Sequence, residues 1–524
     1  MAEGSKSFIA IATESTERVS PDTLTKVRNT GGSGLANDRT VINSEELRDD
    51  GQVIVSRLGN NAPSLEIPIE FSFGEDLGDR NFENLLAAVM GDSKDADSSA
   101  NWKNLLSPEL VTGSIVFNGT ADTVTLTGSD DNWFTLGVIA GNKVQFVAGG
   151  TADASNDAVI MTVGSISSDG SILNISSTNV VDVASQTLTD LKYYTMKKGI
   201  LNLGDFATDS SVDTITLSNS PDVTFTELGI KEGDSVTFTG TDIGTMSGVE
   251  VRVASVDATG LIITTESGDV TSTVSTVALS TTGDNVLTTT TEFISTGVDE
   301  GTFTVAQEFI DNNDNTGAYH SVTGCKVGTA SMSIQPDSII TGTFGLSGQY
   351  YNGFTAGNIL NSDITNGNGT TTTVTAINES NTNDVLDSFI GTINIYNTTL
   401  ASSITSKFTG FDFTIDRSPN VRYALYDQNP TSIGIGRANV SGTISSYFDK
   451  LELAQAYNNE NEIEVRIRMI DSSYNSYLFG FPKIKFTSDS RDITENDVNQ
   501  TINFVALGDV ETAYKTMYVY RQPV

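Results

Sequence analysis

The chain has 524 residues, which is enough for several domains of ordinary size. It carries 66 acidic and 29 basic residues and a formal net charge of −37. This excess of acids excludes the usual mode of nucleic-acid binding, in which Lys and Arg neutralise phosphates, and it disfavours docking on an anionic membrane. A large negative charge can also serve solubility alone, so it indicates no function by itself.

Histidine and cysteine occur once each, as His320 and Cys325. One cysteine excludes an intrachain disulfide framework, and one histidine excludes a zinc site with two histidines. We expect Cys325 to be a small buried hydrophobe and His320 to be a loop residue. No other pattern forms a catalytic constellation. The sequence therefore predicts no enzyme, no catalytic residue, no metal and no cofactor.

The N-terminal part, residues 1–106, begins without a visible secretory signal. No apolar run in the chain is long enough to span a bilayer, so we expect synthesis in a cytoplasm and no membrane anchoring. Residues 13–50 are polar and contain several glycines, which predicts an extended arm and a long loop.

A strand and a short helix follow this arm. The run LEIPIEFSF alternates from Leu65, which puts Glu66 and Glu70 on the face opposite the apolar residues. Pro68 removes a backbone donor and suits an edge strand or a bulge. Residues 80–91 predict a helix, with Asp79 as a plausible N-cap and Gly91 as its stop.

The middle of the chain contains an internal duplication. Residues 122–146 match residues 213–238, and residues 159–176 match residues 249–267. This repeat predicts two tandem small all-β modules, Ig-like or barrel-like, over 107–199 and 200–299. Their position between two unlike halves indicates an insertion at an exposed loop.

The C-terminal part, residues 300–524, returns to strong alternation. TGFDFTID places Asp412 and Asp416 opposite three apolar residues. ENEIEVRIRMI is predicted to be a strand with one apolar and one charged face. Before it, apolar residues recur at helical spacing and predict a helix of about three turns that packs on the strand. The predicted packing residues are Tyr447, Phe448, Leu451, Ala454, Ile463, Val465, Ile467 and Met469, and the charged face carries Glu462, Glu464, Arg466 and Arg468.

In this order, several segments resemble the tail tube proteins of bacteriophages with long, non-contractile tails. They are SEELRDDGQVIVSRLGNNAPSLEIPIEF, FENLLAAVMG, GTFTVAQEFIDNNDNTGAYHSVTGCKVGTASMSIQPDSIITGTFGLSG, ITSKFTGFDFTIDRS and the stretch that ends in FGFPKIKF. The resemblance covers about residues 1–106 and 300–524 and rests on the order of the segments. The inserted modules depart from the basic plan of that family.

The resemblance implies a mainly β protomer, a β-sandwich or barrel with two short α-helices. It implies stacked hexameric rings that form a tube, through which DNA passes without tight binding. It also implies a tape-measure protein in the lumen, contacts with tail tip and tail terminator proteins, and localisation in the virion. The charged strand faces then become candidates for the lumen, where acids would repel phosphate. The lumen candidates are Glu66, Glu70, Asp412, Asp416, Glu462 and Glu464, with Arg466 and Arg468 moderating their charge.

A different class also fits part of the sequence. An acidic bacterial surface-layer protein or adhesin, built from tandem β modules, would explain the Thr-rich repeats and the charge. It does not explain why two helices and a polar arm lie in a frame that does not repeat. The resemblance therefore gives the stronger prediction, and the surface-layer protein is the alternative.

Overall fold

A computed structural model shows a mainly β protein with short helices. It describes residues 7–31, 34–43, 45, 56–74, 81–91, 102–104, 109–127, 133, 143–148, 160–167, 171–176, 183–195, 205–218, 224–226, 228, 230–239, 244–278, 286–297, 300, 301–310, 317–380, 383–400, 402–493, 497–508 and 516–523. The chain divides into two compact units. The first, called the frame, comprises Met1–Ser93 and Ile294–Val519, and the second comprises Lys94–Phe293 and Tyr520–Val524.

The frame contains two α-helices and most of the strands. The helices are α1 (Asn81–Met90) and α2 (Glu452–Asn458). The strands up to the long β23 are β1 (Phe8–Thr13), β2 (Thr23–Lys26), β3 (Ala36–Asp38), β4 (Val41–Asn43), β5 (Ser56–Leu58), β6 (Ala62–Glu70), β22 (Phe303–Ile310) and β23 (Gly317–Ile334). Those that follow are β24 (Thr341–Ser347), β25 (Tyr350–Ala356), β26 (Asp363–Thr365), β27 (Thr371–Thr373), β28 (Ala376–Asn378), β29 (Gly391–Asn397), β30 (Ser402–Ile404), β31 (Phe408–Asp416), β32 (Asn420–Arg422), β33 (Ser432–Gly434), β34 (Asn439–Tyr447), β35 (Ile463–Ile470), β36 (Ser476–Ile493) and β37 (Val498–Ala506). Two more, β21 (Glu292–Ser295) and β38 (Tyr518–Gln522), include the residues at which the chain passes between the units.

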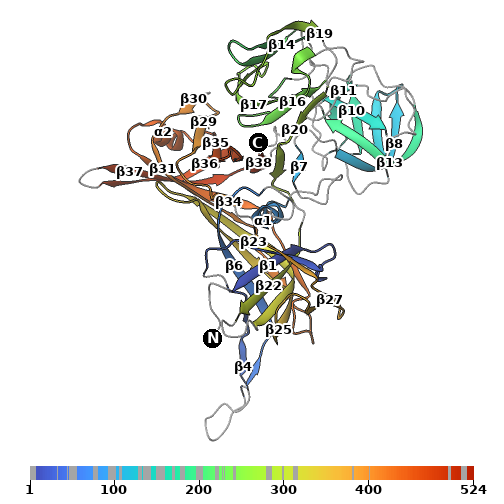
Figure 1. Ribbon diagram of the computed structural model, residues 1–524, viewed down its shortest axis with the longest axis vertical. Helices are drawn as coiled ribbons and strands as arrows, with labels where there is room; N and C mark the ends of the chain where they lie inside the picture. Colours follow the sequence, from blue (N-terminus) through green and yellow to red (C-terminus); the bar gives the residue numbers. More distant parts are fainter. Residues whose placement is uncertain are drawn as a thin grey trace. The chain divides into compact units, whose positions relative to one another are not determined.

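One continuous antiparallel path dominates the frame: β6, β24, β23, β31, β34, β37, β36, β35 and β29, each paired with the next (Figure 1). Three steps separate β31 from β36, which is about 14 Å in a flat sheet. Yet the rings of Phe413 on β31 and Phe481 on β36 lie only 5.3 Å apart, centroid to centroid. The sheet therefore turns back on itself and encloses an aromatic core, as a sandwich does.

The helices cover this core at separate places. Helix α1 contacts β23, and Gly91, with φ of 70°, ends it as the sequence predicted. Asp79, the predicted N-cap, lies outside the described residues. Helix α2 contacts β36 and begins at Glu452, later than the spacing predicted. Tyr447, where the predicted helix pattern begins, is instead the last residue of β34, because β34 pairs with both β31 and β37.

The N-terminal segment is more ordered than an extended arm. Strand β1 lies between β2 and β22, and β2 pairs in parallel with β28. Leu24 is completely buried in a small core with Ala10, Ala306, Tyr319 and others. The prediction that residues 13–50 form an extended arm and a loop rather than part of a core was therefore wrong for residues 23–26, which pair in a sheet and bury Leu24.

The second unit holds two small β modules. The first is a closed barrel of β8 (Glu109–Asn118), β9 (Thr123–Thr127), β10 (Lys143–Ala148), β11 (Ile160–Ile166), β12 (Ile172–Ile175) and β13 (Val183–Thr195). The second is a sheet of β14 (Asp205–Asp209), β15 (Thr214–Ser218), β16 (Ser235–Thr239), β17 (Val249–Val256), β18 (Ile262–Thr265), β19 (Val274–Ala278) and β20 (Val286–Thr289), with the 3-10 helix η2 (Gly244–Met246). The short strand β7 (Lys103–Asn104) precedes them. We call them module 1 and module 2.

Candidate channel and assembly surfaces

One outward face of the frame is almost entirely polar. Residues directly opposite each other in antiparallel strands point to the same side of a sheet, so the registers identify the face. Across β6, β24, β23, β31 and β34 its residues are Glu66, Pro68, Glu70, Thr341, Thr343, Gly345, Thr329, Ser331, Ser333, Asp412, Thr414, Asp416, Asn439, Ser441 and Thr443. None of these positions carries a large apolar side chain. We call this surface the hydroxyl face.

Four of the predicted acids lie on the hydroxyl face: Glu66, Glu70, Asp412 and Asp416. Within the described part of the chain none of the four forms an ion pair. Asp412 accepts hydrogen bonds from the Gln335 amide at 3.2 Å and from Ser333. Neutral donors therefore orient this carboxylate and leave its charge in place.

The other predicted charges lie on β35 or, in the case of Glu462, directly before it. Glu464 pairs with Arg466 at 2.6 Å, and Glu462 pairs with Lys483 at 2.7 Å. Arg468 is buried and donates from Nε to the Ser476 hydroxyl at 3.2 Å. This surface is therefore close to charge-balanced, and Arg468 is not part of its exposed area.

These two sets of charges point away from each other. Asp412 and Asp416 lie opposite the core side of β31, and Glu464 lies opposite the core side of β35. The core sides of β31 and of the β35–β36 pair face each other, as the contact between Phe413 and Phe481 shows. The predicted residues therefore occupy two outward surfaces of the frame rather than one.

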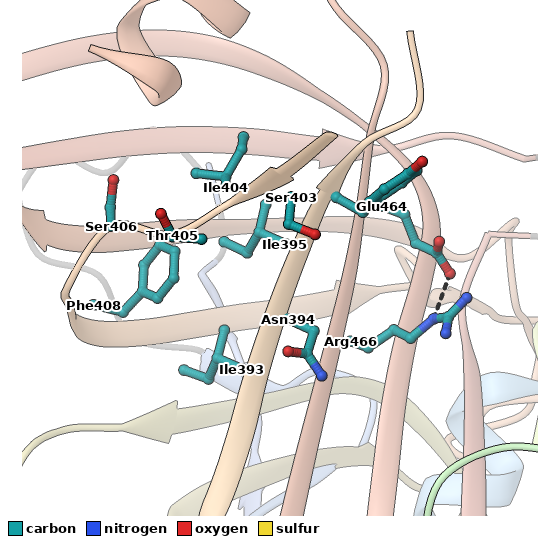
Figure 2. Close-up of a pocket in the computed structure, with 11 residues that line it drawn as sticks. Ile393, Asn394, Ile395, Ser403, Ile404, Thr405, Ser406, Phe408, Glu464 and Arg466 are labelled. Carbon is teal, nitrogen blue, oxygen red and sulfur yellow. Dashed lines mark hydrogen bonds and ion pairs between the residues drawn. The ribbon is translucent and has the colours of Figure 1, made fainter. Parts of the chain in front are cut away.

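A pocket of about 490 Å³ is lined by residues of β29, β30 and β35 and by the residues that lead from β30 into β31 (Figure 2). We call it the groove. Its lining residues are Ile393, Asn394, Ile395, Tyr396, Ser403, Ile404, Thr405, Ser406, Phe408, Glu464 and Arg466. Figure 2 shows Ile393, Ile395, Ile404 and Phe408 around it, with the Glu464–Arg466 pair at one side. The groove is thus mixed in character: the accessible apolar residues are Ile393, Tyr396 and Phe408, polar residues lie between them, and the Glu464–Arg466 pair lies at one side.

The predicted helix-packing residues have different positions. Ile463, Val465, Ile467 and Met469 are buried on the core side of β35, and Ala454 is buried in α2. Tyr447, in β34, and Leu451, the residue that precedes α2, are 44% and 58% exposed. Phe448 is partly buried, with the Arg491 guanidinium 4.6 Å from its ring centroid. The buried residues of α2 are Leu453, Ala454 and Ala456, so its apolar side is shifted from the predicted one.

Two buried polar side chains, Arg417 and His320, were not predicted from the sequence to be buried. Arg417 donates to the backbone oxygens of Gly436 at 3.0 Å, Gly297 at 3.3 Å and Val89 at 3.4 Å, and so connects α1 to distant segments. His320, predicted to be a loop residue, is buried in β23 between Gln307 and Tyr351. Burial lowers its pKa to about 4.

The described residues bring together no group of metal-ligating side chains. Cys325 is buried, as predicted, and burial raises the pKa of its thiol. No helix in the described part of the chain is long and apolar enough to cross a membrane. The candidate functional features of the frame are therefore the hydroxyl face, the charge-balanced face at β35 and the groove.

The frame is thus mainly β and carries one long polar sheet face. A family model described as phage tail tube protein matches residues 4–506. The chain belongs to that family. It is therefore a structural component of a phage tail, of the kind that assembles with its own copies into a tube. No curated protein matches the chain closely enough to count as a relative.

Proposed function

We propose that the protein polymerises as stacked hexameric rings and that the hydroxyl face lines the tube's lumen, through which the genome leaves the virion. The protein acts without catalysis. It is made in the host cytoplasm and meets the tape-measure protein in the lumen and the tip and terminator proteins at the tube's ends. The observation that carries this proposal is the continuous polar face over five paired strands of the frame.

The chemistry of this face suits passage of DNA. Its hydroxyl and amide groups can hold a layer of water, and the residues of the face carry no positive charge, although Arg437 donates to Asn439 at its edge. Glu66, Glu70, Asp412 and Asp416 repel the phosphates. The face on β35 suits this task less well, because Arg466 and Lys483 balance its acids. We therefore place only the first four acids in the lumen.

The two modules project outward in this proposal, since they carry no continuation of the hydroxyl face. The boundaries that we propose for them remain 107–199 and 200–299, between frame segments 1–106 and 300–524. Electron microscopy of tubes formed by the purified protein tests both points. We expect six-fold rings with extra density on the outside. Density for the modules inside the lumen would contradict the proposal.

Charge reversal tests the lumen assignment. Phage particles that carry Glu66→Lys, Glu70→Lys, Asp412→Lys and Asp416→Lys should still assemble tails but eject DNA at least about tenfold more slowly, because lysines would bind the phosphates. The measurement is the rate of DNA release triggered by purified receptor or by intact host cells.

A matched control uses the opposite surface. Glu462→Lys changes the charge of the balanced face without touching the groove and should leave the ejection rate unchanged. Normal ejection from correctly assembled four-lysine tails would refute the lumen assignment. If the control slowed ejection to the same degree, charge on a surface other than the hydroxyl face would be affecting the rate.

A further inference from the structure

Among the exposed apolar residues of the frame are two adjacent ones in the turn between β32 and β33. Leu425 is 89% exposed and Tyr426 is fully exposed, which is unusual for two adjacent large apolar side chains. Tyr426 also has φ of 66°, in the left-handed region that an aromatic residue rarely adopts. We call Tyr423–Tyr426 the knob.

The knob is held in place by hydrogen bonds. The Tyr423 hydroxyl donates to the Asn61 backbone oxygen at 2.9 Å, and the Asn61 N–H donates to the Gln428 oxygen at 2.8 Å. The Asn61 amide also donates to the Asn429 side chain at 2.7 Å. These bonds fix the turn while it presents its apolar side chains to solvent. A strained and rigid apolar turn of this kind is preorganised for a partner.

The knob and the groove lie at opposite ends of the same sheet. Phe408, at the start of β31, lines the groove, and the knob follows the end of that strand at Asp416. Asn61, which anchors the knob, adjoins the end of β6 that pairs with Ser347 of β24. Nine residues of strand separate the two ends by about 26 Å. The knob therefore cannot fill the groove of its own chain.

We propose that the knob of one copy docks in the groove of the next copy, with Tyr426 and Leu425 against Ile393, Tyr396 and Phe408. This inference rests on the proposed function, since the occupant is a second copy within the tube. A knob and a groove at different places on one surface give a heterologous, head-to-tail contact that repeats from copy to copy. The sheet's length lies between them, so the contact runs along the strand direction.

Charges around the two surfaces are complementary. Arg422 and Asp427 flank the knob, and Glu464 and Arg466 lie at the rim of the groove. Glu464 and Arg466 already pair with each other at 2.6 Å, and docking can add Arg422 on the Glu464 side and Asp427 on the Arg466 side of this pair, which fixes the orientation of the knob. A tyrosine at the centre of such a contact, with charges at its edge, has the composition of an interface hot spot.

Disulfide trapping tests the contact. The only native thiol, Cys325, is buried, so the double variant Tyr426→Cys with Ser403→Cys offers two new exposed thiols. We expect mild oxidation of its tubes to give a ladder of covalent oligomers on a non-reducing gel, because each copy carries both halves. Tyr426→Cys with Thr373→Cys is the matched control and should give no ladder. Tubes of the first variant that yield no ladder, or only dimers, would overturn the proposal.

A second variant separates docking from folding. Tyr426→Gly removes the side chain and relieves the backbone strain, so the monomer's Tm should stay equal or rise. The protein concentration needed for half-maximal assembly should rise at least about tenfold. Tyr474→Gly relieves the same kind of strain at φ of 70° in another exposed turn and should leave assembly unchanged. Unchanged assembly of Tyr426→Gly would overturn the proposal.

The same experiments distinguish the two proposals. Tubes of Tyr426→Gly that form at the same protein concentration as the wild type leave the tube function standing and remove the knob contact. If the wild-type chain forms no tubes under any condition, the tube function fails. The knob contact is then judged by the ladder that the Tyr426→Cys, Ser403→Cys variant gives, or does not give, in concentrated solution.

Discussion

Modules 1 and 2 are two versions of one fold that are closed in different ways. The strand order is the same in both, with β16, β17, β18, β15 and β14 in the places of β10, β11, β12, β9 and β8. In module 1 the single long strand β13 pairs with both β8 and β10 and closes the barrel. In module 2 two short strands take its place, β19 beside β14 and β20 beside β16.

The shared details show that the duplication extends to backbone geometry. Asp122 and Asp213, at equivalent turns, both have φ of 49°. Each accepts an equivalent backbone hydrogen bond, from Ile175 and from Thr265. The sheet register also shifts at equivalent places, after Val163 and after Val253. The two modules therefore share their turns and their core pattern but differ in the strand that closes the sheet.

Module 2 also has a buried charge. Asp234 is completely buried and accepts hydrogen bonds from the Lys231 N–H at 2.7 Å, from Thr291 at 3.0 Å and from Gln522 at 2.8 Å. In the repeat alignment its counterpart in module 1 is Asn142, which is neutral and lies outside the described residues. The C-terminal residues of the chain therefore complete module 2 through a carboxylate that module 1 lacks.

The largest expected difference between the modules is pH dependence. Burial raises the pKa of Asp234 to about 6 from 3.8, against hydrogen bonds and the Lys231 charge, which lower it. The other charges in this unit near the C-terminal residues are Glu232 and the Glu292–Arg521 pair. The pKa of Asp234 is higher in the folded than in the unfolded state, so protonation of its carboxyl group favours folding. This contribution to the stability of module 2 is full below about pH 3.8 and is lost as pH rises through about 6.

We therefore expect module 2 to lose about 3 kcal/mol of stability between pH 3 and pH 7 as a consequence of Asp234. Hydrogen exchange of peptides from 205–290 measures this, with peptides from 109–195 as the internal reference. Asp234→Asn, which copies module 1, should remove most of the pH dependence. Equal dependence in both modules, or none in the wild type, would contradict the assignment to Asp234.

Gln522→Ala should have the next largest effect. Its side-chain amide donates both to Asp234 and to the Glu232 backbone oxygen at 3.0 Å. Loss of a donor to a buried carboxylate should destabilise module 2 by about 2 kcal/mol at pH 7 and leave module 1 unchanged. Hydrogen exchange again gives the measurement, and Pro523→Ala is the neighbouring control. If both modules weakened equally, the C-terminal residues would not be specific to module 2.

The sequence predicted the repeat and the alternating strands well, because both depend on local periodicity. The apolar faces of β6, β31 and β35 follow directly from alternation. The start of α2 could not be predicted, because two partner strands decide that Tyr447 belongs to a sheet. The division of the charged residues between two surfaces also depends on how the sheet folds back. The sheet folds back where β31 contacts β36, and these two strands lie far apart in the sequence.

The smallest expected effect tests the turn that the two modules share. Ala tolerates the left-handed region less well than Asp, so Asp122→Ala and Asp213→Ala should each destabilise their own module by about 1 kcal/mol. Asp122→Gly and Asp213→Gly should be milder, because Gly adopts this conformation without strain. Asp213 also accepts a hydrogen bond from the Gly268 N–H at 3.2 Å, so its Gly variant should recover less of the loss. Hydrogen exchange resolves the two modules in one sample. A Gly variant as unstable as its Ala counterpart would mean that the turn does not need the left-handed conformation and that the backbone match between the modules has no energetic role.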